Sequence, residues 1–318
     1  MKMVDLYCGG GLVSLSLAGI GFEVILGVDN NSTALKFYKL NAPHSKAELS
    51  TLGPETDFEW PPDDDDIFVW ASPPCTDISS AQTRPVGSGE LILRWTVKEL
   101  SKRYKTWVVE TSNTDRVKKE LAALKETYSF SWTRVCASEM GSPQTRRRIF
   151  VGPIWLIERL NAWPRVQRPV SVREAFTQAG IVPRGDFVKN NSSSREGTNL
   201  RPISMPSFTI CASRQINWGN GSGETIACMN VAEGACLMGF GNDLNLQLGA
   251  KDAQRVLGNG VCRQVAEVVG KCARGDEPPT PENQPQNETE LLKKRVNELE
   301  ERTRDLERKI ARLEKCND

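Results

Sequence analysis

The chain has 318 residues, of which 25% are charged, and a formal net charge of +1 at pH 7. This composition is typical of a globular protein, and no stretch approaches the roughly 18 consecutive apolar residues that a membrane helix needs. We expect an intracellular protein with no membrane partner, in the nucleus of a eukaryote or in the cytoplasm of a prokaryotic or viral host.

Cysteine and histidine usage narrows the chemistry further. There are nine cysteines and one histidine, His44, and no two cysteines form a Cys-x-x-Cys pair. Neither a disulfide framework nor a structural zinc site is therefore predicted. A single histidine also excludes mechanisms that need a histidine-centred triad or several histidine ligands, so we expect reduced thiols and no metal.

The first half of the chain alternates short β-rich runs with helical patterns such as Ala34–Leu40 and Arg116–Glu126. The predicted strands are Met3–Tyr7, Val24–Val28, Ile67–Ala71, Trp107–Glu110, Ser131–Ala137 and Arg148–Gly152. Such alternation predicts an α/β fold with a mainly parallel, Rossmann-like sheet over residues 1–153. Ligands of such sheets bind at the carboxyl ends of the strands.

The pattern changes after Pro153. Residues 154–228 are rich in Arg, Pro, Asn and Ser and predict a small irregular domain. Residues 229–273 return to the large domain, with one helix predicted over Lys251–Ala273. Residues 274–289 combine prolines with polar neighbours, which predicts an extended linker.

Residues 290–316 show a heptad pattern. Leucines recur every seven residues, and smaller apolar or β-branched residues follow the first three of them by four positions: Leu292, Leu299, Leu306 and Leu313, with Val296, Thr303 and Ile310. Leucine at d with β-branched residues at a favours a parallel two-stranded coiled coil. We predict a parallel homodimer; pairing with another zipper and a single solvated helix remain alternatives.

Polar residues stand where the predicted strands end. Gly9 and Gly11 form a glycine-rich turn after the first strand, which suits either a nucleotide-like ligand or a tight structural turn. Asp29 ends the second strand, where a carboxylate binds ribose hydroxyls or caps a helix. Two prolines, Pro73 and Pro74, precede the thiol of Cys75 and would hold it at this edge of the sheet.

Glu110 ends the next strand, and a later hairpin carries Gln144, Arg146 and Arg148. Alone, each is most simply a solvated surface group. In their order and spacing, however, these residues resemble the motifs of the DNA cytosine-5 methyltransferase family. The matching positions are Asp5, Leu6, Gly9, Gly11 and Ser14; Pro74 and Cys75; Glu110; Gln144, Arg146 and Arg148; and Gly258, Asn259 and Val261.

The resemblance implies a class I S-adenosylmethionine-dependent methyltransferase with a small target-recognition domain that acts on DNA. The Cys75 thiolate would add to C6 of a flipped cytosine and so make C5 nucleophilic. A protonated Glu110 would act as general acid at N3, while Arg148 and Arg146 would hold O2 and favour the thiolate.

The same resemblance implies a binding site for S-adenosylmethionine. It assigns to this site residues of the first turn, the second and third strands, the Pro-Cys segment and the last motif: Asp5, Tyr7, Gly9, Gly11, Asp29, Glu48, Pro73, Asn259 and Val261. Glu48 is expected on the adenine side.

The chain departs from the family pattern at three places. Leu12 replaces a glycine, Thr76 replaces the usual glutamine, and Thr111-Ser112 replaces Asn-Val after Glu110. The small domain is also short, which predicts a short or relaxed recognition sequence. Two alternatives remain: an RNA cytosine-5 methyltransferase acting on tRNA, and a catalytically silent nucleic-acid-binding homologue that acts through its coiled coil.

Overall fold

The computed structural model describes residues 1–62, 64–74, 88–190, 199–213, 215–245, 247 and 249–279. Residues Met1–Asp276 group into one unit by their contacts, and the fold and site lie within it. The predicted nucleophile Cys75, the following Thr76 and the predicted coiled coil of residues 290–316 lie outside the described residues.

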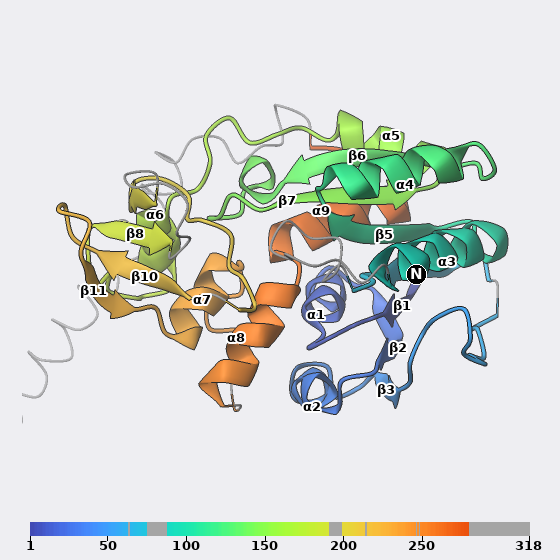
Figure 1. Ribbon diagram of the computed structural model, residues 1–318, viewed down its shortest axis with the longest axis horizontal. Helices are drawn as coiled ribbons and strands as arrows, with labels where there is room; N and C mark the ends of the chain where they lie inside the picture. Colours follow the sequence, from blue (N-terminus) through green and yellow to red (C-terminus); the bar gives the residue numbers. More distant parts are fainter. Residues whose placement is uncertain are drawn as a thin grey trace, which may run out of the picture. The chain divides into compact units, whose positions relative to one another are not determined.

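A sheet of seven strands, in the order β3-β2-β1-β4-β5-β7-β6, forms the large layer (Figure 1). The strands are β1 Lys2–Leu6, β2 Glu23–Asp29, β3 Lys46–Leu49, β4 Ile67–Ala71, β5 Trp107–Ser112, β6 Ser131–Cys136 and β7 Arg147–Gly152. Neighbours from β3 to β5 pair in parallel, and β7 runs antiparallel to both of its neighbours. The predicted mainly parallel α/β fold is confirmed.

Helices cover both faces of this sheet. The helices of the described residues are α1 Leu12–Ala18, α2 Ser32–Asn41, α3 Ser88–Arg103, α4 Asp115–Lys125, α5 Ile154–Ala162, α6 Val172–Gln178, α7 Val231–Leu237, α8 Ala250–Asn259 and α9 Arg263–Arg274, with a 3-10 turn at Ala137–Met140. Strand side chains alternate between two cores. Phe68 and Trp70 pack in the core that contains α1, α5 and α9, whereas Val69 packs in the core that contains α3 and α4.

The predicted helix Lys251–Ala273 is two helices. Gly260 has an extended backbone (φ −77°, ψ 176°) and ends α8, and α9 begins at Arg263. A residue in that conformation cannot continue the i to i−4 hydrogen-bond pattern of a helix. The break leaves the short segment between α8 and α9, including Val261, at the carboxyl edge of the large sheet.

The small domain contains an antiparallel sheet in the order β11-β10-β8-β9, from Phe187–Asn190 (β8), Leu200–Pro202 (β9), Ile216–Gly219 (β10) and Thr225–Cys228 (β11). Trp218 of β10 is fully buried against Phe176 of α6, with ring centroids 5.6 Å apart. The sequence interpretation also assigned α5 to this domain. Instead, α5 packs against β6, β7 and α9, and so belongs with the large sheet.

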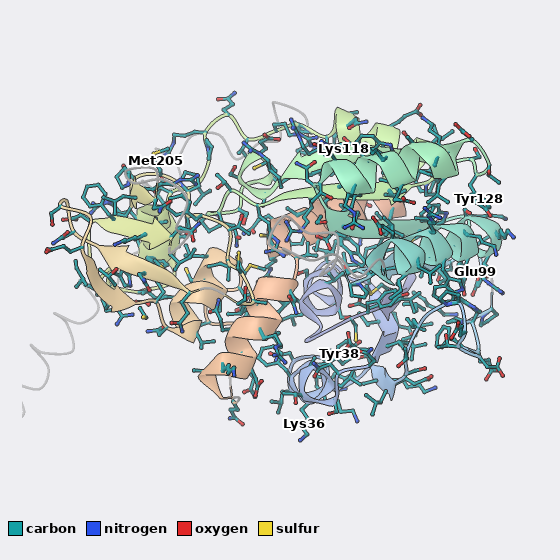
Figure 2. All side chains as sticks on the ribbon, viewed as in Figure 1. Lys36, Tyr38, Glu99, Lys118, Tyr128 and Met205 are labelled. Atoms are coloured by element: carbon teal, nitrogen blue, oxygen red, sulfur yellow. The ribbon has the colours of Figure 1, made fainter. Side chains whose placement is uncertain are left out.

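Helix α2 shows how an amphipathic helix fixes the edge of the sheet next to the site. Lys36 is exposed, whereas Tyr38 is fully buried (Figure 2). A Cβ at Gly27 would lie 2.4 Å from Cζ of Tyr38, and one at Gly11 would lie 2.6 Å from its Cδ2. Both glycines therefore make room for this ring. No helix in the described ranges is long and apolar enough to span a membrane.

Candidate active site

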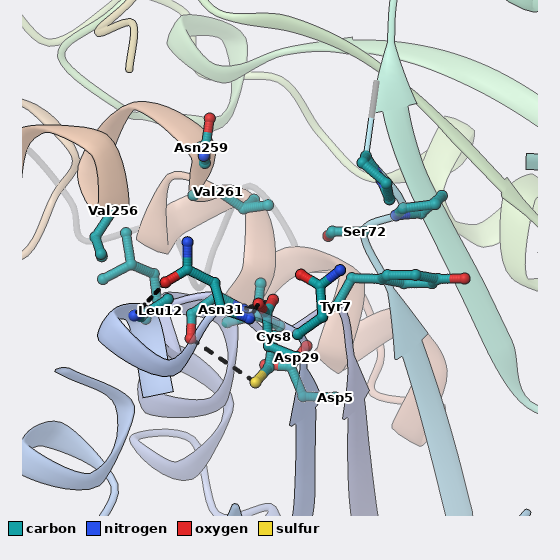
Figure 3. A pocket seen from close by; sticks show the side chains of 18 of the residues that line it. Asp5, Tyr7, Cys8, Leu12, Asp29, Asn31, Ser72, Val256, Asn259 and Val261 are labelled. Atoms are coloured by element: carbon teal, nitrogen blue, oxygen red, sulfur yellow. Dashed lines mark hydrogen bonds between the residues drawn. The ribbon is translucent and has the colours of Figure 1, made fainter. Parts of the chain in front are cut away.

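The strand order reverses at β1, which pairs with β2 on one side and β4 on the other. A cavity of about 310 Å³ opens at this point. Its wall includes most of the predicted site residues: Asp5, Tyr7, Gly9, Asp29, Pro73, Glu110, Arg146, Arg148, Asn259 and Val261. Asp5, Cys8 and Asp29 lie on one side of the cavity and Val256, Asn259 and Val261 on the other (Figure 3).

The glycine turn after β1 presents bare backbone to this cavity. Gly9 has a φ of 52°, and a Cβ at this position would meet no atom within 4 Å. Its N–H donates to Oδ2 of Asp29 at 2.8 Å, and the N–H of Asn31 donates to Oδ1 at 2.8 Å. Asn31, rather than Asp29, caps α2. The Asp29 carboxylate is thus fixed in the cavity wall, where its remaining lone pairs can accept hydrogen bonds from a ligand.

Leu12 fits its position because of a glycine far along the chain. Leu12 is 2% exposed and begins α1. A Cβ at Gly260 would lie 2.3 Å from Cδ1 of Leu12, so the absence of a side chain at Gly260 makes room for the leucine. The departure from the family's glycine at position 12 is therefore compensated by packing.

Asp5 is more deeply buried than Asp29, its neighbour in the cavity wall. It is 1% exposed, and Oδ2 accepts a hydrogen bond from the Ser14 hydroxyl at 2.7 Å. Burial raises the pKa of Asp5 to about 7, and the negative charge of Asp29 acts in the same direction. A positively charged ligand would favour the ionised form of this group.

This shift predicts a pH dependence of stability. Since the pKa of Asp5 rises from 3.8 to about 7 on folding, the folded protein keeps a proton that the unfolded chain releases between these values. The free energy of unfolding should therefore fall as pH rises through this window. Between pH 5 and pH 8 the wild type should lose on the order of 2 kcal/mol more than Asp5→Asn. Urea unfolding at both pH values checks this; equal losses in the two proteins would contradict it.

Tyr7 connects the glycine turn to two neighbouring segments. Its φ of 57° is in the left-handed region, which is uncommon for a residue with a side chain. The hydroxyl lies 3.0 Å from Oγ1 of Thr96 in α3 and donates to the carbonyl oxygen of Leu52 at 3.5 Å. Tyr7 thereby connects one wall of the cavity to α3 and to the segment that follows β3.

Glu110 and Arg148 form an ion pair in the wall of the same cavity. Nε of Arg148 lies 2.8 Å from Oε1 of Glu110, and their side chains are 22% and 8% exposed. In the antiparallel register of β5 and β7, Glu110 is opposite Phe150 and Ser112 is opposite Arg148. Facing residues project to the same side, so Glu110 and Arg148 share one face of the sheet.

Arg146 is buried and already bound to backbone. It is 4% exposed and donates from Nη1 to the carbonyl of Ile210 at 2.9 Å and from Nη2 to that of Gly258 at 3.0 Å. Burial, followed by the charge of Arg148, lowers the pKa of Arg146 to about 10. The structure therefore brings Arg146 to the cavity, as predicted, but uses both of its terminal nitrogens to join the hairpin to the small domain and α8.

Two predicted cofactor residues do not line the cavity. Gly11 lies behind it, against Tyr38. Glu48 forms an ion pair with Lys46 at 3.1 Å on β3. Sequence reasoning also missed several lining residues: Cys8, Asn31, Ser50, Thr51, Leu52, Ile92, Asp252, Arg255 and Val256. The three that follow β3 could have been found had that strand been predicted.

No group of three or more His, Cys, Asp or Glu side chains among the described residues could hold a metal ion. The site thus includes a bare glycine turn, the carboxylates of Asp5 and Asp29 and a buried Glu–Arg pair around one cavity of a doubly wound sheet. Ligands of doubly wound sheets bind at this kind of position, outside the carboxyl ends of the strands where the strand order reverses.

Comparison with known proteins identifies the family. Residues 1–154 match the model of the C-5 cytosine-specific DNA methylase family. The Type II methyltransferase M.HgiDI of Herpetosiphon aurantiacus is 30% identical over 222 residues, which cover 66% of this chain and 71% of the relative. M.HindV of Haemophilus influenzae, also a Type II methyltransferase, is 29% identical over 175 residues, or 51% and 54% of the two chains. The chain belongs to the C-5 cytosine-specific DNA methylase family, as its motifs predicted.

Solved structures agree with this fold. One is a protein described as a DNA modification methyltransferase encoded within a prophage (E. coli), with a TM-score of 0.60 and 17% identity over 86% of this chain and 99% of the other. The Dnmt2 methyltransferase of S. pombe has a TM-score of 0.56 and 13% identity over 86% and 98%. At these identities the likeness shows the fold alone.

Proposed function

We propose that this protein transfers a methyl group from S-adenosylmethionine to C5 of a flipped cytosine in DNA, through a transient covalent adduct with Cys75. The main support is that the Gly9 turn and the Glu110–Arg148 pair line one cavity. Pro74, which directly precedes Cys75 in the chain, is also in its wall. Cofactor groups and a cytosine could thus share one space.

The residues of the cavity fit S-adenosylmethionine. The cofactor carries positive charge on its sulfonium and ammonium groups, and Asp5 and Asp29 place two carboxylates in the wall. Gly9 leaves room for a ligand against its backbone, and Asn259 and Val261 close the opposite side. When bound, the cofactor supplies an electrophilic methyl group.

The protein's own residues would prepare the cytosine. The sulfur of Cys75 bonds to C6, and the electron pair of the C5–C6 double bond makes C5 nucleophilic. Glu110 would hold a proton at N3 so that negative charge does not build up on the ring. Arg148, at the cavity edge, would hold O2. After C5 has accepted the methyl group, a base, for which water is a candidate, takes the C5 proton. The re-formed C5–C6 double bond then expels the thiolate.

The Glu110–Arg148 ion pair bears on this proposal. With no base in the cavity, Arg148 compensates the buried carboxylate. A bound cytosine would offer O2 to the guanidinium and N3 to Glu110, and so replace this pair with two hydrogen bonds to the substrate. The pair would therefore keep both groups in place between turnovers.

Covalent trapping tests the proposal. Duplex DNA containing 5-fluorocytosine should form a stable adduct with the wild type and S-adenosylmethionine, because fluorine at C5 prevents release of the enzyme. Cys75→Ala should form none, and Cys316→Ala serves as a matched control. Labelled cofactor offered with duplex DNA and with tRNA separates the substrates. Labelling of tRNA alone would favour the RNA alternative, and no labelling on varied DNA would favour the silent homologue.

The small domain and the tail extend the proposal. A short domain offers little surface for reading bases, so we propose a recognition sequence shorter than six base pairs, which methylation mapping would check.

We also propose that residues 290–316 pair two chains in parallel, which would raise the local concentration of the second catalytic domain on one DNA. Sedimentation as a monomer at micromolar concentration would contradict this pairing.

A further inference from the structure

Two arginines near the proposed active site share a region without a compensating acid. Arg147 is the first residue of β7 and is exposed, and Arg201 lies in β9 of the small domain. Burial lowers the pKa of Arg201, and the positive charge of the nearby Arg147 lowers it further. Among the described residues, neither guanidinium has a carboxylate within ion-pair distance.

Arg201 is held in a fixed orientation. Its guanidinium carbon lies 4.0 Å from the centroid of the Phe208 ring. Nη1 donates to Oγ1 of Thr145 at 2.8 Å and to the carbonyl of Ser207 at 3.2 Å, with the carbonyl of Pro206 at 3.4 Å. All three contacts use one nitrogen. Nε and Nη2 therefore remain as donors on one edge of the planar group, which is the edge that binds oxyanions in a bidentate manner.

The segments that carry these arginines are bound to each other. The N–H of Thr145 donates to the carbonyl of Ser207 at 2.9 Å, and the hydroxyl of Thr209 donates to the carbonyl of Thr145 at 2.7 Å. Arg201 is thus fixed relative to the hairpin that contains Arg148. Ordering a charged side chain beforehand lowers the entropy that its ligand must overcome on binding.

The strand geometry separates this pair from the cavity. Successive residues of a strand project to opposite faces. Arg148 faces the cavity with Glu110, and Arg147, opposite Cys136 in the register of β6 and β7, faces the other way. An anion bound by Arg147 and Arg201 would therefore lie outside the cavity. It would still be close to the cavity wall, because Arg147 directly precedes Arg148 in the chain.

We propose that Arg147 and Arg201 together bind a backbone phosphate of the DNA beside the flipped cytosine. This inference rests on the proposed function. A phosphate would be the negatively charged partner that the two guanidinium groups do not have among the described side chains. Phosphate contacts also set the position of a protein on DNA without reading its sequence. The pair would thereby position the duplex while Arg148 acts on the base.

The test is the salt dependence of DNA binding by the full-length protein. Fluorescence anisotropy with a labelled cytosine-containing duplex, repeated over a series of salt concentrations, gives the slope of log K against log salt. Arg147→Gln and Arg201→Gln should each weaken binding, and the double variant should reduce the slope by about 1, the value for one lost phosphate contact. Affinity for S-adenosylmethionine should match the wild type. Arg134→Gln, an exposed arginine on β6, is the matched control.

The alternatives give different results. Arg201→Lys keeps the charge, so it should retain the wild-type slope if the phosphate is bound, and it also reports on folding. A slope unchanged in the double variant of a DNA-methylating protein would overturn this inference and leave the proposed function standing. A wild type that binds no DNA would overturn both. A reduced slope with tRNA but not with duplex DNA would overturn the DNA assignment.

Discussion

Glu110→Gln is expected to slow methyl transfer by about 10²- to 10⁴-fold, the range typical of a lost general acid or base. Glutamine has nearly the same shape, so the β5–β7 packing should persist, but the amide cannot deliver a proton to the cytosine ring. It also removes the negative charge that pairs with Arg148 at 2.8 Å. Single-turnover methylation of duplex DNA at saturating cofactor measures the change.

A surface pair provides the control for this experiment. Glu120 of α4 forms an ion pair with Arg94 of α3, away from the cavity wall. Glu120→Gln removes a carboxylate from an ion pair in the same way and should keep near wild-type turnover. If Glu110→Gln turned over within a few-fold of the wild type, Glu110 would not be the proton donor, and the ion pair would be structural.

Gly258→Ala is expected to prevent stable folding. A Cβ at this position would lie 2.0 Å from the backbone nitrogen of Ala212 and 2.2 Å from the carbonyl carbon of Cys211. These are backbone atoms, so no side-chain rotation can relieve the overlap. The segment would have to move away from α8, and Arg146 would lose its alignment with the Gly258 carbonyl. We expect a loss of about 4 kcal/mol or more, at the upper end for single substitutions.

Thermal unfolding and soluble yield measure this loss. Gly53→Ala is the matched change, because a Cβ there would meet nothing within 4 Å and its φ is not in the left-handed region. It should leave the melting temperature within a few degrees of the wild type. A Gly258→Ala protein as stable as the Gly53→Ala protein would show that the 211–212 segment can move freely.

The sequence predicted the strands with strong local signals. Ile67–Ala71 is a continuous apolar run, and Trp107–Ser112 begins with three apolar residues; every position of both strands is buried. Lys46–Leu49 was missed because it is short and carries two charges, and its strand character depends on pairing with β2. The position of Glu48 outside the cavity wall follows from this, since the residues after that strand, rather than those in it, reach the cavity.

The contacts of Arg146 could not be read from its motif. The carbonyl groups that it binds belong to Ile210 and Gly258, which are 64 and 112 residues away in the chain. Spacing within a motif indicates which residue types occur together, whereas these partners depend on how distant segments pack. The same limit applies to Thr111 and Ser112. Their hydroxyl oxygens are buried without a hydrogen-bond partner in the described part of the chain.

The contact between Leu12 and Gly260 makes the choice of residue at one end of the methylase domain depend on the residue at the other. A chimera that took its first turn from a relative with glycine at position 12 would lose a buried side chain, which typically costs about 2–5 kcal/mol for leucine. A relative's larger residue at position 260 would collide with the leucine that remained. Grafts between members of this family should therefore exchange both positions at once.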